Sequence, residues 1–331
     1  MNLKGLHAGW GFCNEVAGAL HTDLIAATLG NHDIDYLKKN GSNPFRPARR
    51  LHERYPVSVA AEKEAFWKQG FCILDRPPLR VAIINSTSQF GDIAEVKRGF
   101  VTEKQLEMFR DRLRSLESQR FQVALVHHHP IQHEILGLGS DDLMKNGECL
   151  IEILREFGFH IVVHGHKHHP RITYSAGGMN SLAVLAAGSV AATTEKGLLS
   201  NTRHLFHIIE LDDDHVAACG PHGIIRSWEF HLHRGWRPAT IGAADVPALT
   251  GFGCRCDLAQ LAQNISQWFE EKAGASGPGF FKWGELVATF PQLRYLIPTD
   301  LKDLATRLTN SYRIELMPPP PEAPERIGRL K

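Results

Sequence analysis

Apolar runs and amphipathic stretches alternate along the first half of the chain. Runs rich in valine, isoleucine and leucine predict buried strands over residues 23–29, 71–74, 79–85, 121–126 and 159–163. Apolar positions spaced three and four residues apart predict a helix over residues 103–116, which begins with a capping box of Thr102 and Gln105. A second helix is expected to end at Gly158. Strands that alternate with helices are typical of an α/β fold.

The pattern changes after Pro170. Short apolar segments follow one another there, with turn residues between them and no helical spacing, at residues 181–187, 205–211, 215–219 and 224–233. They predict a second sheet that is largely antiparallel. Together the two halves predict a two-sheet β-sandwich flanked by helices, forming one α/β domain over residues 1–237.

Beyond Pro238 the composition changes again. Helical patterns over residues 258–272 and 286–308 flank a glycine-rich linker at 274–279, and the prolines at 318–321 predict the start of an extended tail. We therefore expect a small, mostly helical C-terminal module over residues 238–331. Its aromatic residues are expected to form a core or a face for a protein partner.

Net charge, cysteine pattern and the absence of long apolar runs indicate the kind of environment and partner to expect. The formal net charge is +1, so no basic surface indicates nucleic acid, although a local basic stripe is not excluded. The six cysteines are scattered without a C-x-x-C pair, which is typical of a reducing compartment. The first residues given lack a basic region followed by an apolar one, and no apolar run in the sequence approaches membrane-spanning length. We expect a cytoplasmic protein with no membrane partner.

Histidine is the compositional outlier, with 19 residues. Three predicted strands are each followed by polar, metal-binding residue types, in the segments Gly30-Asn31-His32-Asp33, His127-His128-His129 and His164-Gly165-His166-Lys167-His168-His169. The carboxyl ends of strands are where open α/β sheets gather their sites. A metal site explains this pattern better than a histidine-rich surface loop, which is the alternative.

The order of these motifs resembles that of the calcineurin-like metallophosphoesterases. The similarity extends over about residues 1–235 and includes Gly30-Asn31-His32-Asp33, Asn85-Ser86, His128-His129-Pro130, Gly165-His166-Lys167-His168 and Gly188-Ser189. The resemblance implies a β-sandwich flanked by helices, with two divalent metal ions at the strand ends. Imidazole and amide ligands suit manganese, iron or zinc better than calcium.

Carried over residue by residue, the resemblance implies that Asn31, His128 and His166 bind one metal and His168 the other. Strand alternation sends His127 and His128 to opposite faces, so only one of them is expected to be a ligand. The family's His-His-Pro order selects His128, and His127 stays the alternative.

The resemblance also implies catalytic roles for the first motif. His32 would act as general acid or electrophile at the phosphoryl group and leaving oxygen, and Asp33 would hold its ring. His164 and His169 are expected to be neighbours of the site rather than ligands.

The chain departs from the family pattern at its beginning. The Asp-x-His and Gly-Asp motifs, which supply carboxylate ligands, are absent, and residues 1–5, which have no ordering signal of their own, resemble those that follow Gly-Asp in the family. We therefore expect a domain that is incomplete at its N-terminus, where translation begins at an internal methionine. Without carboxylates, the chain is expected to bind metal weakly or to bind a single ion.

The function expected is hydrolysis of a phosphodiester or phosphomonoester by metal-activated hydroxide. One alternative is a catalytically degenerate protein of the same fold with a binding or regulatory role. Another is a nuclease of the same family, although the near-neutral charge argues against nucleic acid. The loops over residues 34–56 and 131–146 are expected to border the site and set its specificity.

Overall fold

The computed structural model places most of the chain. It describes residues 3–37, 42–52, 54–87, 98–132, 143–191, 204–216, 219–231, 233–240, 246–274, 279–320 and 322–330. Parts of the two predicted specificity loops lie outside these residues. The chain forms two compact units, Met1–Lys167 and His168–Lys331. The predicted domain division at residues 237 and 238 stays a prediction.

The described residues of the first unit contribute strands β1, β2, β3 and β4 to one sheet, in that order. Strand β1 (Phe71–Arg76) pairs antiparallel with β2 (Leu79–Ile84). Strands β2, β3 (Phe121–Val126) and β4 (Ile161–His164) pair in parallel, with Val126 level with His164. The carboxyl ends of these three strands therefore meet at one edge of the sheet, where α/β proteins form their sites.

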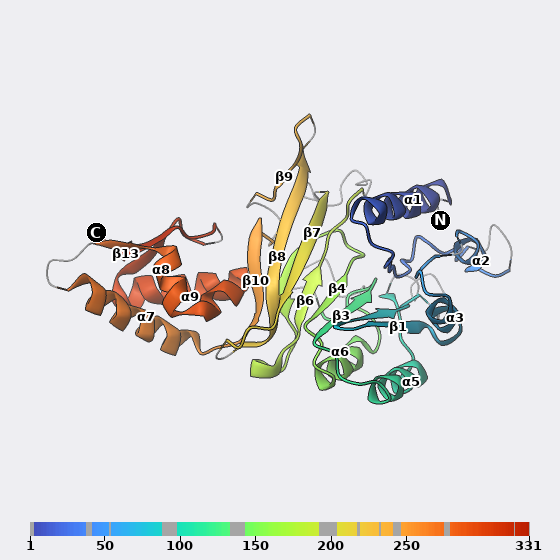
Figure 1. The fold of residues 1–331 in the computed structure, drawn as a ribbon, viewed down its shortest axis with the longest axis horizontal. Coiled ribbons are helices and arrows are strands. Elements are labelled where there is room, and N and C mark those ends of the chain that lie inside the picture. Colours follow the sequence, from blue (N-terminus) through green and yellow to red (C-terminus); the bar gives the residue numbers. More distant parts are fainter. Residues whose placement is uncertain are drawn as a thin grey trace. The chain divides into compact units, whose positions relative to one another are not determined.

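Helices cover both faces of this sheet (Figure 1). Because side chains alternate along a strand, Cys72 and Leu74 of β1 face a core shared with α1 (Leu3–Ala19), α2 (Arg46–Arg49) and α3 (Ala60–Gln69). Phe71 faces the other way and contacts Phe109 of α5 (Glu103–Arg114), with ring centroids 5.3 Å apart. Helix α6 (Gly147–Glu156) packs beside α5. The predicted capping box of Thr102 and Gln105 is present.

Two predictions for the N-terminal region were wrong. Residues 23–29 do not form a strand, since only Ala26 makes an isolated bridge, to Val57. Their apolar side chains are buried instead by packing, with Ile25 and Leu29 in the core beneath α1 and α3. Residues 3–5 belong to α1, which Trp10 anchors in the same core. In both segments, burial against neighbouring helices determines the structure. The periodicity of the sequence does not reveal which helices lie nearby.

The second unit begins with an antiparallel pair, β5 (Arg171–Tyr174) and β6 (Ala183–Ala186), which flank the short helix η1 (Gly178–Asn180). A separate sheet contains β7 (Leu205–Asp212), β8 (Cys219–His231), β9 (Gly235–Pro238) and β10 (Leu249–Cys254). All its pairings are antiparallel, as the sequence predicted, but the predicted segment 181–187 does not belong to it, because β6 pairs with β5.

The end of the chain combines helices with a small sheet. Its elements are α7 (Leu258–Ala273), β11 (Phe280–Lys282), α8 (Trp283–Thr289), η2 (Pro291–Tyr295), α9 (Pro298–Tyr312), β12 (Ile314–Met317) and β13 (Arg326–Arg329). Trp268, Phe269 and Phe281 are buried in its core. The proline-rich stretch does not begin a tail, because it joins β12 to β13, which pair antiparallel. The predicted α/β class with a largely helical C-terminal module is confirmed.

Candidate metal centre

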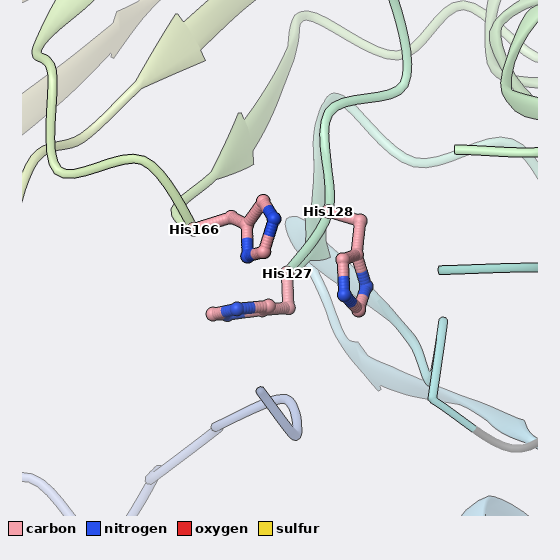
Figure 2. Close-up of side chains that lie close together, drawn as sticks. All are labelled: His127, His128 and His166. Atoms are coloured by element: carbon pink, nitrogen blue, oxygen red, sulfur yellow. The ribbon is translucent and has the colours of Figure 1, made fainter. Parts of the chain in front are cut away.

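Three imidazoles gather at the carboxyl edge of the first unit's sheet. Figure 2 shows His127 and His128 at successive positions after β3 and His166 on the neighbouring segment after β4. One ligand nitrogen from each ring lies within 4.8 Å of the others. The ring centroid of His127 lies 4.9 Å from that of His128 and 5.2 Å from that of His166, and the centroids of His128 and His166 are 4.7 Å apart. These distances allow the three rings to share one ion after small rotations.

The chain reaches this arrangement through its strand ends. Strand β3 stops at Val126, so the alternation that would send His127 and His128 to opposite faces no longer applies at these residues. The amide of Gly165 donates a hydrogen bond of 3.1 Å to the carbonyl of His127, which ties the two segments together. His166 then adopts a left-handed conformation with φ of 79°, an uncommon and costly state that is typical of functional sites.

Asn31 joins the cluster from the N-terminal segment. Its side chain is buried, and its Oδ1 lies 3.1 Å from Nε2 of His127, a distance at which the ring N–H donates to the amide oxygen. Gly30 makes this approach possible, because a Cβ at that position would lie 2.7 Å from Cε1 of His127. Asn31 and His127 are 96 positions apart in the sequence.

His128 is the most enclosed of the three histidines. It has no exposed surface, and its Nδ1 lies 2.7 Å from the hydroxyl oxygen of Ser86, which follows β2. Gly99 has φ of +73°, and a Cβ there would lie 2.3 Å from the His128 ring. A hydrogen bond to one ring nitrogen fixes the orientation of a histidine ligand and presents its other nitrogen to a metal. Ser86 therefore positions His128 so that a metal would bind through Nε2.

The predicted catalytic pair lies in the turn beside Asn31. His32 is exposed, as a residue that meets substrate must be. Asp33 accepts a 2.8 Å hydrogen bond from the amide of Gly30 and donates one of 3.0 Å from its own amide to the Gly30 carbonyl. Burial raises the pKa of the Asp33 carboxyl, while the hydrogen bond from the Gly30 amide and the charge of His32 act in the opposite direction. Asp33 thus stabilises the turn, and its predicted role toward His32 stays a prediction.

The other histidines of the two histidine-rich motifs fall into two groups. His129 and His164 are buried and contact each other, with ring centroids 4.5 Å apart, and His164 Nδ1 lies 3.2 Å from the Gly165 carbonyl. His168 and His169 begin the second unit, so the predicted role of His168 as ligand to a second metal stays a prediction. His127, the alternative to His128 in the sequence analysis, lies in the cluster together with His128.

The donor set fits a transition metal. Three imidazole nitrogens with an amide oxygen nearby suit zinc, manganese or iron. Within the described part of the chain, no aspartate or glutamate joins the group. The second candidate cluster, Asp212, Asp213 and Asp214, lies on consecutive residues at a half-exposed to exposed strand end of the other unit. Its first member accepts a 2.7 Å hydrogen bond from the hydroxyl of Tyr295.

Comparison with solved structures found distant similarities. A purple acid phosphatase, PPD1 from yellow lupin (Lupinus luteus) seeds, is 15% identical over 60% of this chain, with a TM-score of 0.36, and the chain spans only 37% of its length. Wild-type Vps29 complexed with Zn²⁺, from Entamoeba histolytica, is 17% identical over 38% of this chain and 71% of its own, with a TM-score of 0.20. No curated protein matches the chain.

Two family models match the sequence. Residues 250–310 match the family described as wHTH-Calcineurin_assc. Residues 8–170 match the calcineurin-like phosphoesterase family, and this range contains Asn31 and all three histidines of the cluster. The chain therefore belongs, through residues 8–170, to the calcineurin-like phosphoesterase family.

Proposed function

We propose that the chain is a metal-dependent phosphoesterase that hydrolyses a phosphodiester or a phosphomonoester. The observation that carries this proposal is the convergence of His127, His128 and His166 at the carboxyl ends of two adjacent parallel strands. A bound divalent metal would supply an activated hydroxide and charge stabilisation at the phosphoryl oxygens. The family membership of residues 8–170 supports the same chemistry.

Each neighbouring residue has a defined part in this proposal. The three histidines hold the first ion, His168 is proposed for a second, and manganese, iron and zinc are the metals considered. Asn31 restrains His127 through its amide oxygen, and the same oxygen is proposed as a further ligand. His32, exposed in the adjacent turn, is proposed to donate a proton to the leaving oxygen.

A degenerate protein that binds metal or phosphate without turnover is the second candidate. It is favoured by the absence of any carboxylate from the cluster in the part of the chain that the structure describes. Neutral imidazoles leave the charge of a dication uncompensated, which weakens its binding and disfavours a second ion nearby. Under this proposal the same residues would bind a phosphorylated partner.

The C-terminal module is proposed to contact protein rather than nucleic acid. Helix α7 carries two glutamates and one lysine, and α9 carries two aspartates, one lysine and one arginine. Arg307 and Asp303 of α9 also pair with each other at 3.1 Å. Neither helix therefore presents the basic stripe that binding to a phosphate backbone requires.

Metal binding and hydrolysis can be tested separately. The purified chain would be titrated with zinc and with manganese by calorimetry, and assayed on bis-p-nitrophenyl phosphate and p-nitrophenyl phosphate. We expect His128→Ala and His166→Ala to abolish metal binding and any hydrolysis, and the exposed His7→Ala to change neither. Metal binding without hydrolysis would select the degenerate protein, and no difference among the variants would refute the site.

A further inference from the structure

A pocket in the first unit is independent of the histidine cluster. It has a volume of about 530 Å³ and lies among α2, the end of α3, the start of α5 and the residue after β2. None of the cluster histidines is among its described lining residues. Its size falls within the range of small-molecule sites, roughly 300–1,000 Å³.

The charge of the pocket has one sign. Its described lining includes the cationic side chains of Arg49, Lys68 and Lys104 and no carboxylate. The three cations come from three different helices, α2, α3 and α5, so their convergence is produced by the fold and not by a run of basic sequence. Lys104 also lies in the first turn of α5, where the helix dipole favours an anion.

One wall of the pocket is aromatic. Phe45 and Trp67 both line it, with ring centroids 6.4 Å apart and ring planes inclined at 62° to each other. Arg49 is held against this wall, because its Nη2 donates a 3.0 Å hydrogen bond to the Trp67 carbonyl and its Cζ lies 5.1 Å from the Trp67 ring centroid. The guanidinium is therefore pre-oriented, which reduces the entropy lost when an anion binds.

We propose that this pocket binds a small molecule that carries several negative charges and an aromatic ring, the chemistry of a nucleotide. Guanidinium and ammonium groups suit phosphate oxygens, and the edges and faces of aromatic side chains suit a flat ring. The ligand would bind without a metal, since the pocket contains none of the cluster's histidines among its described lining residues. The pocket is thus a second site, and its ligand binding does not depend on the function of the histidine cluster.

The test is a binding titration of the full chain in the presence of a metal chelator. ADP is the probe, inorganic pyrophosphate tests the charge alone, and adenosine tests the ring alone. Calorimetry and tryptophan fluorescence report binding, since Trp67 lines the pocket. We expect saturable ADP binding that is tighter than binding of either partial probe. ADP binding should also persist in His128→Ala, which alters only the histidine cluster.

Charge reversal identifies the pocket as the place of binding. The double variant Lys68→Glu and Lys104→Glu is expected to weaken ADP binding by at least about tenfold. Arg76→Glu with Arg112→Glu is the matched control, because it makes the same charge change at exposed positions outside the described lining. Trp67→Phe should remove the fluorescence change while calorimetry still detects ADP. No saturable ADP binding, an equal loss in the control, or a loss in His128→Ala would each overturn the proposal.

Discussion

Replacing Gly30 with alanine is expected to weaken metal binding without unfolding the chain. The backbone of Gly30 does not require a positive φ, so alanine is compatible with the turn itself. Its Cβ, however, would lie 2.7, 2.9 and 3.1 Å from three ring atoms of His127. Non-bonded carbon atoms prefer about 3.5–4.0 Å, so the ring must move by roughly 1 Å.

The cost of that movement can be worked out from the contacts of the ring. The hydrogen bond between His127 and Asn31, now 3.1 Å, would be lost, at about 1 kcal/mol. Holding the ring in a displaced rotamer for the metal adds about 0.5–1.5 kcal/mol. The sum of about 2 kcal/mol corresponds to roughly a thirtyfold weaker affinity for zinc or manganese.

Gly165→Ala is the matched control, because it adds the same methyl group beside the same ring. There the nearest atom of His127, Nδ1, would lie 3.7 Å from the new Cβ, which is ordinary contact. Calorimetric titration of both variants, with circular dichroism to check folding, measures the difference. Equal metal affinities in Gly30→Ala and the unsubstituted chain would show that His127 is not held as described, and so would equal losses in the two variants.

Three further outcomes follow from the contacts of single residues. Ser86→Ala should lower metal affinity about tenfold in calorimetry, because Ser86 orients His128, with unchanged circular dichroism. Thr102→Ala removes the cap of α5 and should cost about 1 kcal/mol in chemical denaturation. Burial lowers the pKa of His207 below its usual 6.5, so the folded state resists protonation. Stability should be full above pH 6.5 and decrease below it, and His207→Gln should flatten this dependence in urea titrations.

Local patterns predicted the parts of the fold that depend on neighbours in sequence. The buried runs became β1 to β4 and the spaced apolar positions became α5, because strand and helix periodicities are properties of the segment itself. Residues 23–29 have the same apolar character as β3, yet they are buried under α1 and α3 and pair with no sheet. Which partner buries an apolar run is decided by contacts far along the chain, which no window of sequence contains.

The candidate site, like the fold, could be predicted from the sequence only in part. That His128 and His166 converge follows from their positions after adjacent strands, since parallel strands end at one edge. The inclusion of His127 could not follow from strand alternation, because the ring turns inward only after β3 has ended. Gly30 belongs to a motif that the sequence shows, but the sequence does not reveal that Gly30, like Gly99, provides the space that a histidine ring fills.

The charge of the site bears on the choice between the two proposed functions. Every described donor at the cluster is neutral, so an ion bound there keeps its full double charge toward an incoming phosphate. Such a site attracts substrate and product phosphates as strongly as the transition state, and binding that is uniform in this way does not raise turnover. Tight inhibition by inorganic phosphate with slow hydrolysis would therefore indicate a neutral cluster acting alone. Rapid turnover with weak phosphate inhibition would require an anionic group to join the three histidines during catalysis.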